Sequence, residues 1–263
     1  MDLTTLIGLV LGLASLLVAF MLEGGGLGAL VVPTAAMIVF GGTFGATAIS
    51  FTPEELKKMP YFFKRIFTES KVDYVSILDS LVDTADMARR EGLLSLESKL
   101  GDIDNKFFAR GLQLVIDGTD PDLTRNMLEM EIEAYENGEK VGVEVFMTMG
   151  GFGPTFGIVG TVMGMVTLLS HLSSPDELGP MIAVAFLATL YGIASANLFW
   201  IPFATKIKVK TARDALLMEM VLEGILSIQA GENPRVIREK LMTFLPPEIK
   251  SIIVEQEALQ KGA

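Results

Sequence analysis

The sequence contains no cysteine and a single histidine, His171, among its 263 residues. Without thiols the chain forms no disulfide and offers no thiolate to a metal or a substrate, and one imidazole cannot build a multi-histidine metal site. The chain also lacks a phosphate-binding loop ending in Lys-Ser/Thr, an HExxH motif and a GxSxG motif. Its net charge of −11 argues against nucleic acid as a partner. These absences predict a protein that is not an enzyme and carries no cofactor or resident metal.

Asp, Glu, Lys and Arg are absent from four long stretches, residues 3–22, 27–51, 145–175 and 178–204. The chain is 50% hydrophobic and still 20% charged, so apolar and charged residues are segregated. At ~1.5 Å per residue, a helix of ~20 residues crosses the ~30 Å hydrocarbon core of a bilayer. The sequence therefore predicts an all-α membrane protein with four transmembrane helices, a large helical cytoplasmic loop and a helical cytoplasmic tail.

The first apolar stretch, 3–22, has a second interpretation as a cleaved signal peptide. A signal peptide has a basic start, a shorter apolar core and a small-residue cleavage site. Here the chain begins Met-Asp, and no such site precedes Glu23. We expect this stretch to be retained as a membrane span, joined to the second one by a short turn at 23–26.

Positive charge predicts how the spans are oriented. All 21 Lys and Arg residues lie in 52–140 and 205–263, and the turns at 23–26 and 173–177 contain none. Loops rich in Lys and Arg stay in the cytoplasm. We therefore expect a four-pass protein of the bacterial cytoplasmic (inner) membrane with both termini in the cytoplasm. Its expected regions are two transmembrane helices in 1–51, a cytoplasmic helical loop in 52–140, two further transmembrane helices in 141–204 and a cytoplasmic tail in 205–263.

The cytoplasmic loop has clear helical signals. In 73–90, apolar residues recur at three- and four-residue spacing, which predicts an amphipathic helix that Gly92 interrupts. Asp120 as N-cap and Pro121 at the first helical position predict the start of another helix, which continues toward the third span.

The third stretch combines a glycine face with a proline. Its glycines recur at spacings of three and four and so share one helical face: Gly153, Gly157, Gly160 and Gly164. Such a face allows another helix to approach closely, and packing alone is a sufficient explanation for it. Pro154 removes a backbone hydrogen bond and predicts a kink. We expect the fourth stretch to end at Pro202.

None of the four stretches contains Asp, Glu, Lys or Arg, although a proton relay normally uses such a group. Either the protein moves no ions, or a partner provides the titratable group. His171 lies near the outer edge of its span and is interpreted as an interfacial residue rather than a relay member. The hydroxyls of Thr161 and Thr189 are predicted to face each other or a partner, and simple hydrogen bonding between helices is the alternative.

Four segments together resemble the flagellar motor stator subunit family MotA/PomA. They are VPTAAMIVFGGTFGA (32–46), MARREGLLSLE (87–97), GGFGPTFGIVGTVMGMV (150–166) and LGPMIAVAFLATLYGIASAN (178–197). The resemblance covers nearly the whole chain, in the family's order. It implies an ion-driven torque generator in which a ring of A subunits, five in the family, surrounds two single-span B subunits. The B helix carries the ion-binding Asp and a peptidoglycan-binding region, and the cytoplasmic loops push on the rotor's switch protein.

The resemblance also implies roles for individual residues. Ion-path residues are Thr161, Thr189 and Ala188; residues for coupling or B-subunit contact are Pro154, Pro202, Gly157, Gly160, Gly164 and Tyr191; and rotor-contact residues are Arg89, Arg90 and Glu97. Sodium-type members have a second threonine where this chain has Ala188. One oxygen fewer disfavours Na⁺, which needs several oxygen ligands, so H⁺ is the expected ion and Na⁺ the alternative.

Two other functions stay open at this point. The first is an energiser of outer-membrane transport of the ExbB/TolQ type, against which the four-span layout argues. The second is a membrane scaffold that conducts no ions. From spacing alone, the charges at Arg89 and Glu97 favour a solvated helix face, and it is the family resemblance that favours rotor contact.

Overall fold

The computed structural model describes residues 2–69, 73–173, 175–251 and 253. It divides into two compact units: Met1–Glu69 with Gly138–Val209, and Ser70–Asn137 with Lys210–Ala263. All regular secondary structure in the described residues is helical. Four of the helical segments are long and apolar enough to cross a membrane: Leu3–Leu22, Leu27–Ser50, Pro121–Ser170 and Leu178–Gln229. The predicted all-α class with four membrane helices is confirmed.

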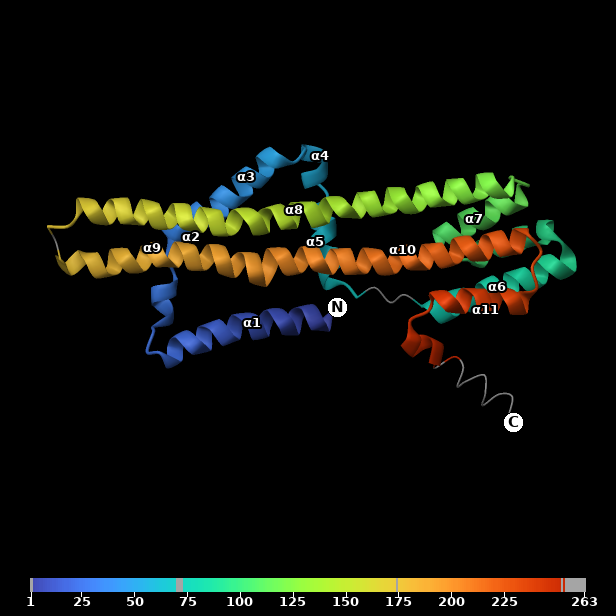
Figure 1. Cartoon of the computed structure of the whole chain (residues 1–263), viewed down its shortest axis with the longest axis horizontal. Coiled ribbons are helices and arrows are strands. Elements are labelled where there is room, and N and C mark those ends of the chain that lie inside the picture. Colours follow the sequence, from blue (N-terminus) through green and yellow to red (C-terminus); the bar gives the residue numbers. More distant parts are fainter. Residues whose placement is uncertain (1, 70–72, 174, 252, 254–263) are drawn as a thin grey trace. The chain divides into compact units, whose positions relative to one another are not determined.

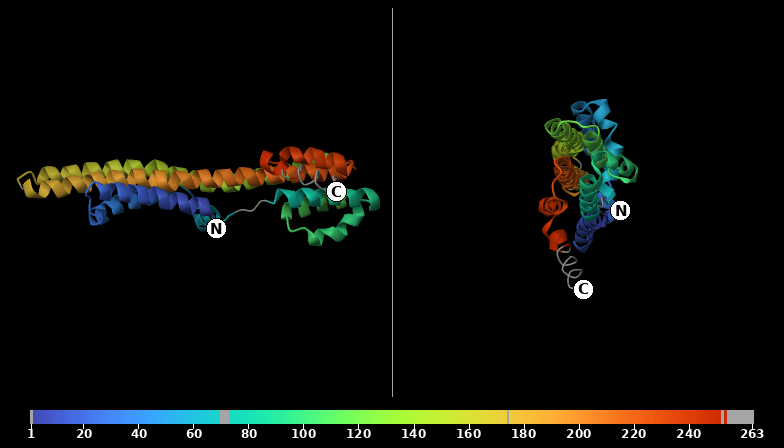
Figure 2. Two further views of the ribbon diagram at one scale, coloured as in Figure 1. Left: turned by 90° about the horizontal axis from the view of Figure 1, so that it is seen from below. Right: turned by 90° about the vertical axis from the view of Figure 1, so that its right-hand side faces the viewer.

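The scaffold of the first unit consists of the long helix α8 and of a second helical segment that runs back alongside it (Figure 1). Helix α8 runs without interruption over Pro121–Ser170. The return path consists of α9 (Pro175–Ser195), a π-helical turn η4 (Ala196–Trp200) and α10 (Ile201–Gln229). In this unit α8 and the return path lie side by side, as both figures show (Figures 1 and 2). The predicted start of α8 is confirmed, because the carboxylate of Asp120 accepts hydrogen bonds from the backbone N–H of Asp122 and Leu123.

The helix of the fourth span does not end at Pro202, contrary to the prediction, and the residue at which the span leaves the membrane stays a prediction. Pro202 is the second residue of α10, which continues to Gln229. A proline inside a helix lacks the N–H that would bond the carbonyl four residues earlier. The π-turn η4 comes directly before α10, and such a turn locally rearranges the backbone hydrogen bonds of a helix. The chain thus accommodates Pro202 without ending the helix.

The first two membrane segments pack on different parts of this scaffold. Helix α1 (Leu3–Leu22) has no buried residue and contacts η4 and α5 (Met59–Phe67). Gly12 admits the close approach, since a Cβ there would lie 2.7 Å from the Leu198 side chain. The second segment packs on α9 instead. It comprises η1 (Leu27–Leu30), α2 (Pro33–Ala36), the π-turn η2 (Met37–Gly41) and α3 (Gly42–Ser50).

The chain turns sharply after the second segment. Thr52 and Glu55 form a capping box that starts α4 (Pro53–Leu56), and α5 follows. Phe62 of α5 fits against α8 at Gly142, where a Cβ would lie 2.5 Å from its ring. An aromatic core consisting of Phe62, Phe146, Trp200 and Phe203 fills the space between α5, α8 and the fourth segment.

The second unit packs shorter helices around parts of α8 and α10. Its elements are α6 (Tyr74–Glu91), the 3₁₀ segment η3 (Leu93–Asp102), α7 (Lys106–Ile116), α11 (Pro234–Leu241) and the 3₁₀ turn η5 (Met242–Phe244). The predicted amphipathic helix over 73–90 is confirmed, with Leu78, Leu81 and Ala85 buried in the core. Gly92 ends it with φ of 87°, a conformation that favours glycine.

Candidate functional site

The hydroxyls of Thr161 and Thr189 lie against each other between α8 and α9. Their Oγ1 atoms are 2.5 Å apart. The Thr161 hydroxyl is also 2.9 Å from the Ala185 carbonyl oxygen and 3.1 Å from that of Gly157. The Thr189 hydroxyl is 3.4 Å from the same Gly157 carbonyl. Two hydroxyls and two backbone carbonyls therefore form a small polar cluster inside an apolar, charge-free region.

Glycines bring the two helices close enough for this cluster to form. A Cβ built on Gly192 would lie 2.4 Å from the carbonyl oxygen of Gly153 and 3.1 Å from the Cα of Pro154. A Cβ on Gly157 would lie 3.0 Å from the Ala188 carbonyl oxygen. The predicted glycine face is thus occupied by α9, with backbone packed against backbone beside the proline.

The other two glycines of this face pack against alanine side chains of α9. A Cβ on Gly160 would lie 2.6 Å from the Cβ of Ala188, and one on Gly164 would lie 2.7 Å from the Cβ of Ala185. Ala188 itself is 1% exposed and belongs to a small cluster with Ala35 and Val39 of the second segment. Its methyl group therefore adds no oxygen to the threonine cluster.

Tyr191 ties the second segment to α9. Its hydroxyl donates a hydrogen bond to the carbonyl of Leu30 and accepts one from the backbone N–H of Val32 at 3.0 Å. Its ring stacks on Phe40 with the centroids 6.4 Å apart. The sequence gives little sign of this contact, because its partners are backbone groups about 160 residues away in the chain. The geometry indicates that Tyr191 fixes where α2 begins.

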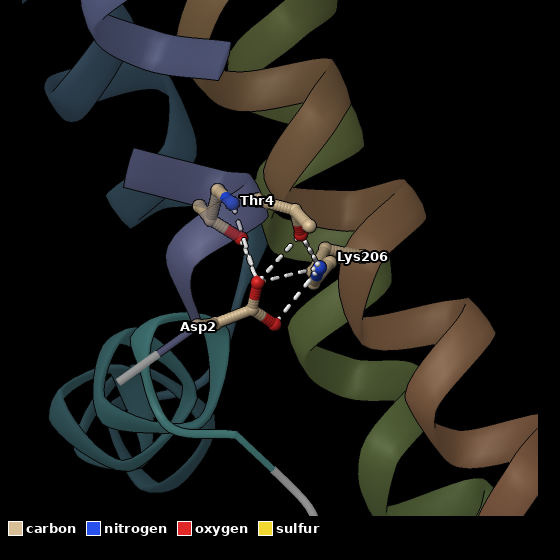
Figure 3. A network of polar contacts seen from close by, with 4 residues as sticks. Asp2, Thr4 and Lys206 are labelled. Atoms are coloured by element: carbon tan, nitrogen blue, oxygen red, sulfur yellow. Dashed lines mark hydrogen bonds and ion pairs between the residues drawn. The ribbon is translucent and has the colours of Figure 1, made fainter. Parts of the chain in front are cut away.

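A polar network that we did not predict anchors the start of α1 (Figure 3). The Asp2 carboxylate caps α1 by accepting from the N–H of Thr5, and it also accepts from the Thr4 hydroxyl at 2.7 Å. The Lys206 ammonium lies 2.8 Å from Asp2 Oδ2 and 3.1 Å from the Thr4 hydroxyl. The backbone N–H of Asp2 donates to the carbonyl of Phe67 at 2.9 Å. Asp2 thereby joins the end of α1 to α10 and α5.

A second charged contact joins α5 to α8. The Arg65 guanidinium lies 2.9 Å from Glu139, whose side chain is 6% exposed. The Tyr61 hydroxyl donates to the other Glu139 oxygen at 2.7 Å. Burial, together with this hydrogen bond to a carboxylate, raises the pKa of Tyr61 above its ordinary value. The phenol therefore stays protonated and keeps donating to Glu139.

The predicted rotor-contact residues belong to the second unit, whereas the threonine cluster belongs to the first. Arg89 and Arg90 form the last turn of α6, and Glu97 lies in η3; all three are exposed. Arg90 pairs with Asp86 on its own helix at 2.7 Å. Within the described residues, no group of three or more His, Cys, Asp or Glu could hold a metal ion.

These features together define a class: a helical membrane protein with four candidate spans, a polar cluster of hydroxyls without charged groups, and exposed charges outside the spans. Residues 99–220 match the model of the MotA/TolQ/ExbB proton channel family, and residues 6–92 match that of the motility protein A N-terminal region. The chain belongs to the motility protein A family. Because the second match is to a motility protein, it favours the stator subunit over the energiser of the ExbB/TolQ type.

Full-length relatives agree with this assignment. Motility protein A of Bacillus subtilis is 38% identical over 263 residues, covering 100% of this chain and 97% of the relative. Chemotaxis protein PomA of Vibrio alginolyticus is 33% identical, with 97% and 100% covered.

Two solved structures have the same fold. One is the MotAB structure of C. jejuni, which has a TM-score of 0.90 and 30% identity and covers 94% of this chain and 97% of that one. The other is the flagellar MotAB stator complex of Bacillus subtilis, with a TM-score of 0.86 and 38% identity over 93% and 97% of the two chains.

Proposed function

We propose that this chain is the A subunit of an ion-driven flagellar stator and that it forms a cation channel with a single-span B subunit. The observation that carries the proposal is its likeness, over the full chain, to a motility protein A and to MotAB stator structures. In this proposal several A subunits, five as in the family, form a ring around the B helices in the bacterial inner membrane. Both termini, the loop 52–140 and the tail 205–263 lie in the cytoplasm.

The partner supplies the acidic group that the membrane segments of this chain lack. The membrane segments of the chain hold no Asp, Glu, Lys or Arg, so the acid that takes up each cation comes from the B helix. Thr161 and Thr189 line the path beside that acid. H⁺ is the favoured ion because the cluster offers two hydroxyls, and Ala188, buried against the second segment, offers no third. A hard cation such as Na⁺ needs several oxygen ligands, so one hydroxyl fewer disfavours it.

Coupling of ion flow to movement is assigned to the helices around the cluster. Gly157, Gly160 and Gly164 with Pro154 keep α8 and α9 in close contact, so a change at the cluster moves both helices together. Pro202 and Tyr191 act further along the fourth segment and at the start of α2. Arg89, Arg90 and Glu97 present exposed charge to the rotor switch protein, which gives an attraction that forms and releases quickly.

Complementation tests this proposal. The chain and its B subunit are expressed in a motile bacterium that lacks its own stator genes, and swimming speed is measured while external Na⁺ is varied at a fixed proton gradient. We expect restored swimming at a speed independent of Na⁺. The variant Thr189→Ala is expected to abolish swimming, whereas Thr205→Ala, which removes an exposed hydroxyl bonded only within its own helix, is the matched control. Failure of the wild-type pair to assemble or to turn a rotor would contradict the proposal.

A further inference from the structure

We propose that the C-terminal helix α11 is a brace that holds the rotor-facing helix α6 in register with α10 and α8, and that Arg238 and Lys240 are its positioning residues. This inference rests on the proposed function, because it assumes that α6 receives load from the rotor. It assigns a role to a helix of eight residues in the tail that neither the motifs nor the threonine cluster explains.

The apolar side of α11 holds it against the core of the second unit. Ile237 and Leu241, one helical turn apart, are both 0% exposed and join the same core cluster as Leu78 and Leu81 of α6. Asn233 caps the helix and Pro234 occupies its first position, so the backbone starts at a defined residue. Apolar contact of this kind is not directional. It keeps α11 packed on α6 but does not by itself fix the position of one helix along the axis of the other.

An ion pair fixes the position of α11 along α6. Arg238 Nη1 lies 2.7 Å from Asp79 Oδ1, and the Arg238 side chain is 27% exposed. Asp79 precedes Arg89 by ten residues, which is about 15 Å along the same helix. A sideways force applied at the exposed end of α6 therefore acts on a helix that is tied at its other half by this pair.

A second set of contacts continues from α11 to the long helices. Lys240 lies 2.9 Å from Glu223 of α10 and 3.2 Å from the hydroxyl of Ser227. Glu223 in turn lies 3.1 Å from Arg125 of α8. The charged contacts thus run from α6 through α11 to α10 and on to α8.

The ionisation of Glu223 favours its ion pairs with Lys240 and Arg125. Partial burial raises the pKa of Glu223, but the hydrogen bonds from Lys240 and Arg125 lower it more, so the pKa lies below its ordinary value. Glu223 therefore stays ionised near neutral pH and binds both cations. Half-exposed pairs of this kind contribute little to overall stability. What matters for transmitting force is their effect on geometry, because these pairs fix the positions of α8, α10 and α11 along one another.

The test measures torque per stator unit. A bead is attached to single flagella of stator-deficient cells that express this chain with its B subunit, and the step in speed is recorded as each stator joins the motor. Arg238→Asp and Asp79→Arg each place like charges opposite one another. We expect each to lose torque per step, with the number of stators in the motor and the ion conductance unchanged. The double variant with both changes restores an opposite-charge pair and should recover the torque.

Arg235→Asp is the matched control, since Arg235 lies on the same helix, is 84% exposed and pairs with Glu239 of its own helix. We expect wild-type torque from it. If Arg238→Asp does not enter the motor, Arg238→Gln decides the question, because it removes the pair without repulsion. Wild-type torque from the Arg238 and Asp79 variants, or no recovery in the double variant, would overturn the brace. Absence of any rotation with the wild-type chain would instead overturn the proposed function.

Discussion

Replacing Gly192 with alanine should separate the two helices that form the threonine cluster. The new Cβ would lie 2.4 Å from the carbonyl oxygen of Gly153. An ordinary contact between such a carbon and oxygen is about 3.3–3.6 Å. The obstructing atom is backbone, so the helices must move apart by about 1 Å. Applied to Thr161 and Thr189, that displacement lengthens their 2.5 Å contact to about 3.5 Å, beyond a normal hydrogen bond.

The change in the free energy of unfolding can be estimated from three contributions. Overpacking costs about 1–3 kcal/mol, and loss of the interhelical hydrogen bond adds about 0.6 kcal/mol. The change from glycine to alanine returns up to about 1 kcal/mol of helix propensity. With the full propensity gain, the net destabilisation is roughly 0.6–2.6 kcal/mol, or roughly 1–10 °C in Tm for a chain of this size.

Gly151 provides the matched control. It lies on α8 close to Gly153, and a Cβ there would meet nothing within 4 Å. Gly151→Ala should therefore keep or slightly raise the Tm of the purified full chain in detergent, whereas Gly192→Ala lowers it. Equal Tm values for the two variants would refute the idea that backbone contact at Gly192 sets the helix spacing.

Three further changes are predicted from the polar contacts. Arg65→Ala leaves the buried Glu139 carboxylate without its guanidinium and should lower the free energy of unfolding by about 3–5 kcal/mol. Replacing both residues by apolar ones should lower it much less. Thermal unfolding of the full chain compares the single and the double variant. The depressed pKa of Glu223 adds stability above the ordinary glutamate pKa of about 4.3, and this is lost as pH falls through the folded-state value. Glu223→Gln should therefore show a smaller loss of Tm between pH 6 and pH 3 than wild type does, and an identical pH profile would contradict this. Tyr191→Phe leaves the Val32 N–H without its acceptor, so hydrogen exchange at that amide should speed up while exchange within α1 is unchanged.

Local signals in the sequence predict where several helices begin and end. The α1 boundaries follow from a charge-free run, and the start of α8 follows from Asp120 and Pro121. The sequence predicts that Pro202 ends its helix, whereas in the structure the helix continues past Pro202 directly after the π-turn η4. A π-turn cannot be inferred from residue types alone.

Long-range contacts were harder to predict from the sequence. Thr161 and Thr189 are found together, as their placement on neighbouring spans suggested, but their role in the ion path stays a prediction. The Asp2–Lys206 network joins residues 204 positions apart. Charges at the edges of apolar runs are common, and nothing in the spacing indicates which of them pair. Only the folded arrangement of α1 beside α10 selects that pair.

The threonine cluster has a consequence for a subunit on its own. Each hydroxyl carries a single hydrogen, and each already has acceptors within 3.5 Å on its own or the neighbouring helix. The four apolar stretches also contain no Asp, Glu, Lys or Arg that could take up a proton there, so we expect a cell that makes this chain alone to keep its membrane voltage and internal pH.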